Sequence, residues 1–225
     1  MMRRRLAVLL ALLALPVAAA AGAGCQLALA LAVDVSGSVD SAEYRQQMDG
    51  LAAALRDQQV AEGLVGADAA VMLVQWSDAS RQEETIPWQR TQSLAAVARL
   101  ATRVARAPRR WRNYSTALGE ALAVTLAAFA DAPRCARRVI DVSGDGFSNE
   151  GRAPSTVVAA LDAAGVTVNG LAIEGSTADL TGYYLQNVIH GAGAFVMTAK
   201  GFQDYPDAIR RKLLREVTLM VARAR

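Results

Sequence analysis

The stretch Leu27-Ala-Leu-Ala-Leu-Ala-Val-Asp34-Val-Ser-Gly-Ser38 decides the fold of this chain. Residues 27–34 form an almost unbroken apolar run, which predicts a strand that is covered on both faces of a sheet. Asp40 and Glu43 follow with the spacing of a capping box, so we expect a helix to begin there and to reach about Gln58. A buried strand followed by a helix is the repeating unit of an α/β sheet.

The rest of the chain repeats this alternation of strands and helices. Further strands are predicted at residues 69–76, 138–143, 166–173 and 193–198. An edge strand is predicted at 84–89, because Pro87 is tolerated only at a sheet edge. Further helices are predicted at 93–107, 116–130 and 154–164. A closing amphipathic helix is marked by apolar residues at helical spacing, namely Phe202, Tyr205, Ile209, Leu213, Val217 and Met220. Together these elements predict one doubly wound α/β domain over residues 24–225, with a mostly parallel sheet of about six strands.

The first residues have the pattern of a secretory signal peptide. Arg3, Arg4 and Arg5 precede an apolar run from Leu6 to Ala21, and Ala21-Gly22-Ala23 is a small-residue cleavage site. Residues 1–23 are therefore predicted to be removed on export to the periplasm or the extracellular space.

The charge balance argues against a nucleic-acid partner. The chain has 24 Lys and Arg against 21 Asp and Glu, and loss of the three arginines in residues 1–23 leaves equal numbers. A neutral mature chain lacks the basic excess of nucleic-acid-binding proteins. Its 53% apolar residues exclude a disordered chain. After residue 23 no apolar run is long enough for a membrane span.

Two cysteines, Cys25 and Cys135, remain in the exported chain. An oxidising compartment favours a disulfide between them over two free thiols. The alternative for Cys25 is a lipid anchor just after the signal peptide, but Gly22 stands where such anchors normally have a residue like leucine.

Polar side chains follow the first strand at regular spacing. Asp34, Ser36 and Ser38 occupy alternate positions in a turn that Gly37 permits, so their oxygens are expected to converge on one point. One carboxylate, two hydroxyls and water suit Mg²⁺ or Mn²⁺ better than zinc. The alternative is a polar turn whose serines only satisfy backbone groups.

Two later segments add oxygen ligands in the same context. Asp145 follows the strand at 138–143, and Thr116 begins the segment Thr116-Ala-Leu-Gly-Glu-Ala-Leu122 at a helix start. Asp-x-Ser-x-Ser, then Thr-x-Leu-Gly-x-Ala-Leu, then Asp-Gly after a strand resembles the von Willebrand factor type A (VWA) domain. The resemblance extends from Leu27 to the closing helix. The blocks 137–146 and 168–173 also resemble exported bacterial members of that family.

The resemblance implies a metal-ion-dependent adhesion site in which Asp34, Ser36, Ser38, Thr116 and Asp145 hold Mg²⁺ or Mn²⁺, directly or through water. It implies an open coordination position that takes an Asp or Glu carboxylate from a protein partner. The family often has glycines before its threonine, whereas this chain has Tyr114 and Ser115, so Ser115 is an alternative ligand to Thr116. At about 3.3 Å per residue along a strand, both cysteines are expected roughly 30 Å below the site. The family's sheet order also places the strands that follow Cys25 and Cys135 side by side, about 5 Å apart, which a disulfide can span.

Further residues are expected at the rim of this site. Arg99, Arg103, Arg106, Arg109, Arg110 and Arg112 form a basic run with no acid among them. A solvated helix face is the simpler interpretation of the run, but its end lies close to Thr116 in sequence. Arg109 and Arg112 are therefore expected to attract an acidic ligand. Tyr114, Phe147 and Asn149 complete the expected rim.

The leading hypothesis is a non-enzymatic adhesion or scaffolding module. The alternatives are a Mg²⁺-dependent phosphoryl-transfer or hydrolytic enzyme and a metal-free structural envelope protein. The enzyme alternative normally needs a second acid two residues after the first, where this chain has Ser36. The single histidine, His190, is expected at the far end of the sheet with a structural role. Asp141, inside a central strand, is expected to be a structural acid with buried partners, and Glu174 a solvated loop acid.

Overall fold

The computed structural model describes residues 24–175 and 177–223, and side chains up to residue 218. The predicted signal peptide, residues 1–23, lies outside the described residues, as does the side chain of Met220 in the predicted closing helix.

Six strands form one sheet in the order β3-β2-β1-β4-β5-β6. The strands are β1 (Leu27–Asp34), β2 (Ala70–Trp76), β3 (Gln82–Arg90), β4 (Arg137–Gly144), β5 (Val166–Ile173) and β6 (Val196–Ala199). All neighbouring pairs are parallel except β2 and β3, which are antiparallel. β3 lies at one edge of the sheet. Pro87, which has no backbone N–H to donate, is tolerated in such an edge strand. The predicted doubly wound, mostly parallel sheet is confirmed.

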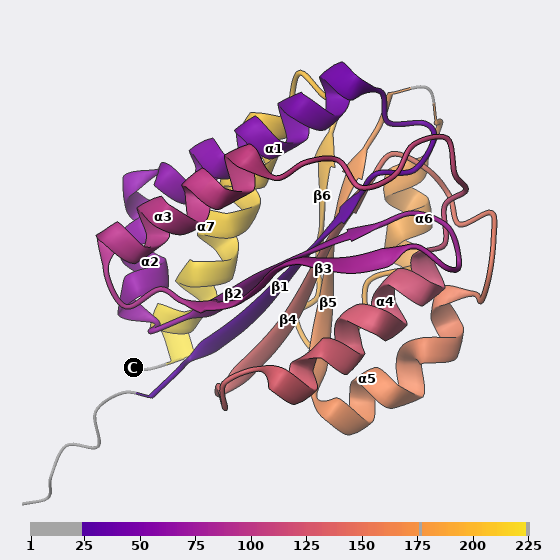
Figure 1. Cartoon of the computed structure of the whole chain (residues 1–225). Coiled ribbons are helices and arrows are strands. Elements are labelled where there is room, and N and C mark those ends of the chain that lie inside the picture. Colours follow the sequence, from indigo (N-terminus) through magenta and orange to yellow (C-terminus); the bar gives the residue numbers. More distant parts are fainter. Residues whose placement is uncertain (1–23, 176, 224–225) are drawn as a thin grey trace, which may run out of the picture.

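Helices cover both faces of the sheet (Figure 1). One face carries α1 (Ser41–Arg56), α2 (Gln58–Gly66), α3 (Leu94–Arg106) and α7 (Tyr205–Arg223). The other face carries α4 (Leu118–Ala127), α5 (Val158–Ala164) and α6 (Leu180–Asn187), together with the short 3₁₀ helices η1 (Ala128–Asp131) and η2 (Pro154–Val157).

The central strand β1 shows why the sequence forms this layered arrangement. Every residue of β1 is buried. Leu27, Leu29 and Leu31 pack with the core under α1 and α7, while the alanines between them pack with the core under α4. Side chains alternate between the two faces of a strand, so large residues face one helical layer and small residues let the other approach closely.

The structure corrects several predicted element boundaries. The first helix ends at Arg56 rather than near Gln58, because the Asp57 side chain accepts hydrogen bonds from Gln59 and Val60 and so caps a separate helix, α2. Helix α6 was not predicted at all, since it has only eight residues and begins without a side-chain cap. The predicted capping box of Asp40 and Glu43 is confirmed.

The predicted disulfide joins the starts of two neighbouring strands. Cys25 and Cys135 are bonded with a Cα–Cα distance of 4.5 Å. They lie just before β1 and β4, which pair in parallel from Leu27 and Arg137 onward. The family's sheet order, which placed these strands side by side, is therefore confirmed.

A buried ion cluster lies between α7 and the sheet. Lys212 Nζ lies 2.7 Å from Asp141 Oδ2 and 3.7 Å from Glu216 Oε1, and both its side chain and that of Glu216 are fully buried. Arg137 contacts Glu216 Oε2 at 2.7 Å, and Asn169 donates a hydrogen bond to Glu216 Oε1. Burial raises the pKa of Asp141 to about 6, although the adjacent Lys212 opposes the rise. Asp141 is thus a structural acid with buried partners, as predicted.

Within the described part of the chain, no helix is both long and apolar enough to cross a membrane.

Candidate metal site

The candidate site begins where β1 ends. Asp34 is the last residue of β1, and its Oδ1 accepts a hydrogen bond of 2.7 Å from the backbone N–H of Ser36. The buried Gln47 of α1 donates to the backbone oxygen of Asp34 at 3.3 Å. Asp34 and Ser36 are both fully buried. The turn after β1 is therefore fixed from inside the protein, not only by its own sequence.

Asp145 meets this turn from the neighbouring strand. The Oγ atoms of Ser36 and Ser38 lie 3.2 Å apart, and Ser38 Oγ donates a hydrogen bond of 2.6 Å to Asp145 Oδ1. Asp145 directly follows β4, which pairs with β1. Parallel neighbours end at the same edge of a sheet, so the two acids and two serines are brought together as the sequence predicted.

Thr116 approaches the same cluster from the loop before α4. Its backbone N–H donates to Asn149 Oδ1, and its carbonyl accepts from the Asn149 N–H, both at 2.9 Å. Thr116 is buried, and its Oγ1 lies 3.6 Å from the point where a Cβ on Gly146 would stand. Ser115 is exposed instead, and its carbonyl accepts a hydrogen bond from Ser77 Oγ. Of the two alternative ligands, Thr116 is therefore the one whose hydroxyl lies near the loop that carries Asp145.

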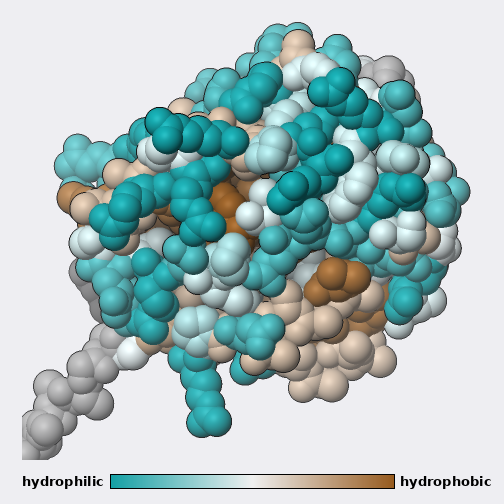
Figure 2. Space-filling model, viewed as in Figure 1, coloured by the Kyte–Doolittle hydropathy of each residue, from teal (hydrophilic) through white to brown (hydrophobic). Residues whose placement is uncertain are grey.

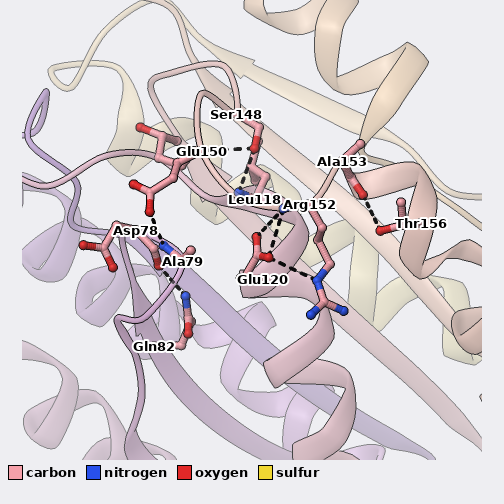
Figure 3. Close-up of polar contacts among 11 residues, drawn as sticks. Asp78, Ala79, Gln82, Leu118, Glu120, Ser148, Glu150, Arg152, Ala153 and Thr156 are labelled. Atoms are coloured by element: carbon pink, nitrogen blue, oxygen red, sulfur yellow. Dashed lines mark hydrogen bonds and ion pairs between the residues drawn. The ribbon is translucent and has the colours of Figure 1, made fainter.

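The loop after Asp145 is tied to α4 by side-chain and backbone bonds (Figure 3). Ser148 Oγ accepts from the Leu118 N–H at 3.2 Å, and the Glu120 carboxylate accepts from the Arg152 N–H at 2.9 and 3.0 Å. A Cβ on Gly119 would come within 2.2 Å of the Arg152 carbonyl oxygen, so glycine is required at this close approach. These contacts account for the glycine of the Leu-Gly-x-Ala-Leu pattern and hold the start of α4 against the loop that follows Asp145.

The electrostatics of the cluster favour a bound cation. Asp34 Oδ2 is buried and has no hydrogen-bond partner among the described residues. Burial, and then the negative charge of Asp145, raise the pKa of Asp34 to about 7, while the bond from Ser36 opposes the rise. Burial also raises the pKa of Asp145. A divalent ion would satisfy the unpaired oxygen and cancel the repulsion between the two carboxylates, so the donor set fits such an ion.

The side chains of the cluster supply oxygen ligands only. In residues 24–175 and 177–223, no group of three or more His, Cys, Asp or Glu side chains could hold a metal ion. The cluster instead supplies two carboxylates and three hydroxyls. Such a set of hard oxygens suits Mg²⁺ or Mn²⁺ and lacks the nitrogen and sulfur ligands of typical zinc sites.

Tyr184 of α6 is a neighbour of the cluster that sequence reasoning missed. A Cβ on Gly144 would stand 2.8 Å from both Asp34 Oδ2 and Tyr184 Oη, so both oxygens lie close to this glycine. The Tyr184 hydroxyl is buried without a partner among the described residues. Burial, and then Asp34, raise its pKa well above the usual value. No sequence pattern indicated Tyr184, because α6 itself was not predicted.

The predicted rim residues have different surroundings. Arg109 is half-buried, and its guanidinium donates to the carbonyl oxygens of Val35 at 3.1 Å and Ser36 at 2.9 Å. Arg109 thus fixes the backbone of the turn after β1. The sequence did not indicate this contact. Arg112 is exposed. The pKa of Arg109 is lowered, first by its burial and then by the positive charge of Arg112.

Two exposed aromatic rings stand beside the cluster. Tyr114 is 41% exposed, and its ring packs against Arg81 with the guanidinium carbon 3.6 Å from the ring centre. Phe147 is 42% exposed and packs edge-on against Tyr183, with ring centres 4.9 Å apart. Supported aromatic rings at a surface are typical of protein-binding sites.

His190 and Glu174 lie outside the cluster. His190 pairs through its backbone with Val168, near the start of β5, and its Nε2 lies 2.6 Å from Asp162 Oδ1. His190 therefore lies at the end of the sheet away from the cluster, as predicted. Glu174 is partly buried rather than freely solvated, because it accepts hydrogen bonds from the N–H and hydroxyl of Thr181.

Solved structures share this fold. Proximal thread matrix protein 1 of the mussel byssus superposes with a TM-score of 0.66 at 18% identity, over 86% of this chain and 48% of that chain. A second structure of it, with a zinc-occupied MIDAS motif, gives a TM-score of 0.62 at 13% identity, over 87% and 46%. The pilus adhesin SpaC of Lactobacillus rhamnosus GG gives 0.61 at 13% identity, over 87% and 30%.

A von Willebrand factor type A protein of Catenulispora acidiphila gives a TM-score of 0.58 at 18% identity, over 85% of this chain and 43% of that chain. This chain therefore spans about half, or less, of the solved proteins it resembles. No curated protein matches the chain. The family model described as "Protein of unknown function (DUF1194)" matches residues 24–221. The chain belongs to this DUF1194 family, and its described part has the VWA fold.

Proposed function

We propose that this protein is an exported, non-catalytic adhesion or scaffolding module that binds a protein partner through a divalent ion. The ion, Mg²⁺ or Mn²⁺, would be held by the side chains of Asp34, Ser36, Ser38, Thr116 and Asp145. The observation that supports the proposal best is the unpartnered Asp34 oxygen, buried beside a second acid and three hydroxyls at the end of two parallel strands.

Each part of the chain has a separate task in this proposal. The turn after β1 supplies Asp34 and two serines, and Arg109 and Gln47 fix its carbonyl groups. The bound ion supplies a positive charge that attracts an Asp or Glu carboxylate of the partner. Because Mg²⁺ gives up its water reluctantly, the surrounding surface must supply further affinity. Tyr114, Phe147, Asn149 and Arg112 are the proposed surface.

The proposal of a non-catalytic role rests on the chemistry near the cluster. Ser36 stands where a phosphoryl-transfer site of this kind would have its second acid, and His190 is bound to Asp162 at the other end of β5. The resembling proteins include a pilus adhesin and a thread matrix protein, which agrees with adhesion or scaffolding. The Cys25–Cys135 disulfide agrees with export to an oxidising compartment.

Asp34→Ala is expected to abolish stabilisation by the ion without unfolding the protein. At about 100 times its dissociation constant, an ion that binds only the folded state adds about 2.7 kcal/mol, or a rise of about 5–10 °C in Tm. Thermal unfolding in Mg²⁺, in Mn²⁺ and in a chelator measures this rise. In chelator, Asp34→Ala is expected to stay folded, because removal of the buried carboxylate next to Asp145 offsets part of the cost of losing its hydrogen bond to the Ser36 N–H.

A matched control separates loss of the site from loss of charge. Asp131 is an exposed acid of η1, on the far side of α4 from the cluster, and Asp131→Ala should keep the full rise in Tm. Equal rises in wild type and Asp34→Ala would show that the ion binds elsewhere.

A partner captured on the immobilised protein is expected to need the ion. It should bind in Mg²⁺, elute in chelator and be missing from an Asp34→Ala column run in parallel. Arg112→Ala should mainly slow association, because Arg112 is exposed and acts over a distance. A partner retained equally in chelator, or by Asp34→Ala, would place recognition on another surface.

A further inference from the structure

A recess between α3 and β3 forms a second candidate binding site. It has a volume of about 280 Å³, and three arginines, Arg103, Arg106 and Arg110, line it. Ile86 and Ala107 form part of its apolar wall. Figure 2 shows an apolar hollow surrounded by hydrophilic residues on this face. We call this recess the arginine pocket.

The arginine pocket carries positive charge that the protein itself does not neutralise. Arg110 pairs with Glu83 at 2.5 Å. Arg103 and Arg106 are exposed and form no ion pair or hydrogen bond with any described residue. Both lie in the last turn of α3, where basic residues favour the helix dipole. That effect explains their presence on the helix but not their gathering around an apolar recess with a third arginine.

The arginine pocket is rigidly connected to the candidate metal site. Gln75 of β2 donates to the Pro108 carbonyl and accepts from the Arg110 N–H, both at 3.0 Å, so the segment that lines the pocket is fixed to the sheet. Arg109, between these two residues, reaches the carbonyl groups of Val35 and Ser36. One arginine side chain therefore separates the wall of the pocket from the turn that carries Asp34.

We propose that the arginine pocket binds a second acidic side chain of the peptide segment whose first carboxylate reaches the ion. This proposal rests on the function proposed above. Guanidinium groups bind carboxylates through paired, charge-assisted hydrogen bonds, and the Ile86 wall accommodates the methylenes of a Glu side chain. The recess is too small for a folded element but large enough for one side chain and its neighbours. The partner segment is therefore extended, and its second acid reaches the arginine pocket while the first reaches the ion.

Binding of a fluorescein-labelled hexaglutamate peptide to the full mature chain tests this proposal. In chelator, fluorescence anisotropy is expected to show weak binding that falls with added salt. Arg103→Gln with Arg106→Gln should weaken it about tenfold, the combined effect of two exposed charge pairs. Lys200→Gln with Arg211→Gln removes the same charge from exposed positions outside the pocket, and it should change the affinity less than twofold.

The two proposals fail in different ways. Added Mg²⁺ should tighten the peptide further in wild type but should not do so in Asp34→Ala. If Mg²⁺ has no effect while the arginine dependence persists, the ion-bridged function is wrong and the arginine pocket remains as an acidic-peptide site alone. Equal losses in the two double variants, or no binding in chelator, would overturn the pocket. The pocket proposal would also fail if vesicles of phosphatidylglycerol, but not the peptide, bound in an Arg103- and Arg106-dependent way.

Discussion

Lys212→Met is expected to lower the free energy of unfolding at pH 7.5 by about 3–5 kcal/mol, the usual cost of removing one partner from a buried ion pair. Lys212 is fully buried, and its ammonium group lies 2.7 Å from Asp141 Oδ2. Methionine fills a similar volume but leaves Asp141 without its cation in the protein interior, so the acid must either stay charged and unpaired or bind a proton. Urea unfolding of the disulfide-bonded chain measures the change.

The size of this effect should depend on pH. In the wild type, the pKa of Asp141 is about 6 in the folded state, above its ordinary value of 3.8. Protonation of Asp141 therefore stabilises the folded state. This contribution to stability is fully present below pH 3.8 and is lost as the pH rises through about 6. Without Lys212 the folded-state pKa rises further. The deficit of Lys212→Met should therefore be smaller at pH 5 than at pH 7.5.

Two further variants test this explanation. Lys200→Met removes an exposed lysine and should cost little at either pH. Lys212→Met combined with Asp141→Asn removes both charges and should recover part of the lost stability. A deficit that is the same at pH 5 and pH 7.5 would mean that lost packing, rather than the unpaired acid, destabilises the variant.

Replacing both Cys25 and Cys135 by serine is expected to cost about 4–5 kcal/mol in the chain-entropy model of disulfides, with smaller values common in practice. The bond closes a separation of 110 residues, so it restricts the unfolded chain strongly. Unfolding of the double variant, compared with oxidised and reduced wild type, measures the effect. Reduced wild type should match the double variant, and a reduced protein as stable as the oxidised one would contradict the expectation.

The intact mass of natively exported protein tests the same bond together with the proposed signal peptide. We expect a chain that begins near Gly24 and that has two hydrogens fewer than the thiol form. Cys25 and Cys135 should react with an alkylating agent only after reduction. A chain that still begins at Met1 would contradict the export proposal, and an added lipid mass would instead favour an anchor at Cys25.

The sheet and the two acids and two serines of the candidate cluster could be predicted from local patterns, whereas the place of Thr116 came from the resemblance to the VWA family. The apolar run before Asp34 indicates a buried strand, and the spacing of Asp34, Ser36 and Ser38 follows from a single turn. Asp145 stands directly after another predicted strand. Parallel strands end at one edge of a sheet, so these groups are brought together without any knowledge of side-chain packing.

What the sequence did not reveal depends on contacts between distant segments. Tyr184 reaches the space beside Asp34 from a helix with no cap signal, and Gln47 binds the Asp34 carbonyl from the buried face of α1. Arg109 is one more member of a basic run in the sequence, yet its side chain turns inward to the backbone of the turn after β1. Only the packing of the helices on the sheet separates Arg109 from its neighbours.

The disulfide also has a mechanical consequence. The disulfide links the starts of β1 and β4. At the other end of these strands, the hydrogen bond from Ser38 to Asp145 links the segments that follow them. The two strands are paired throughout, from Leu27 and Arg137 to Val33 and Ser143. A load between a ligand held at that end and the chain at residue 24 would thus enter β4 as well as β1. The hydrogen bonds on both sides of this strand pair would then share the load in shear, and β1 alone would not be peeled out of the sheet.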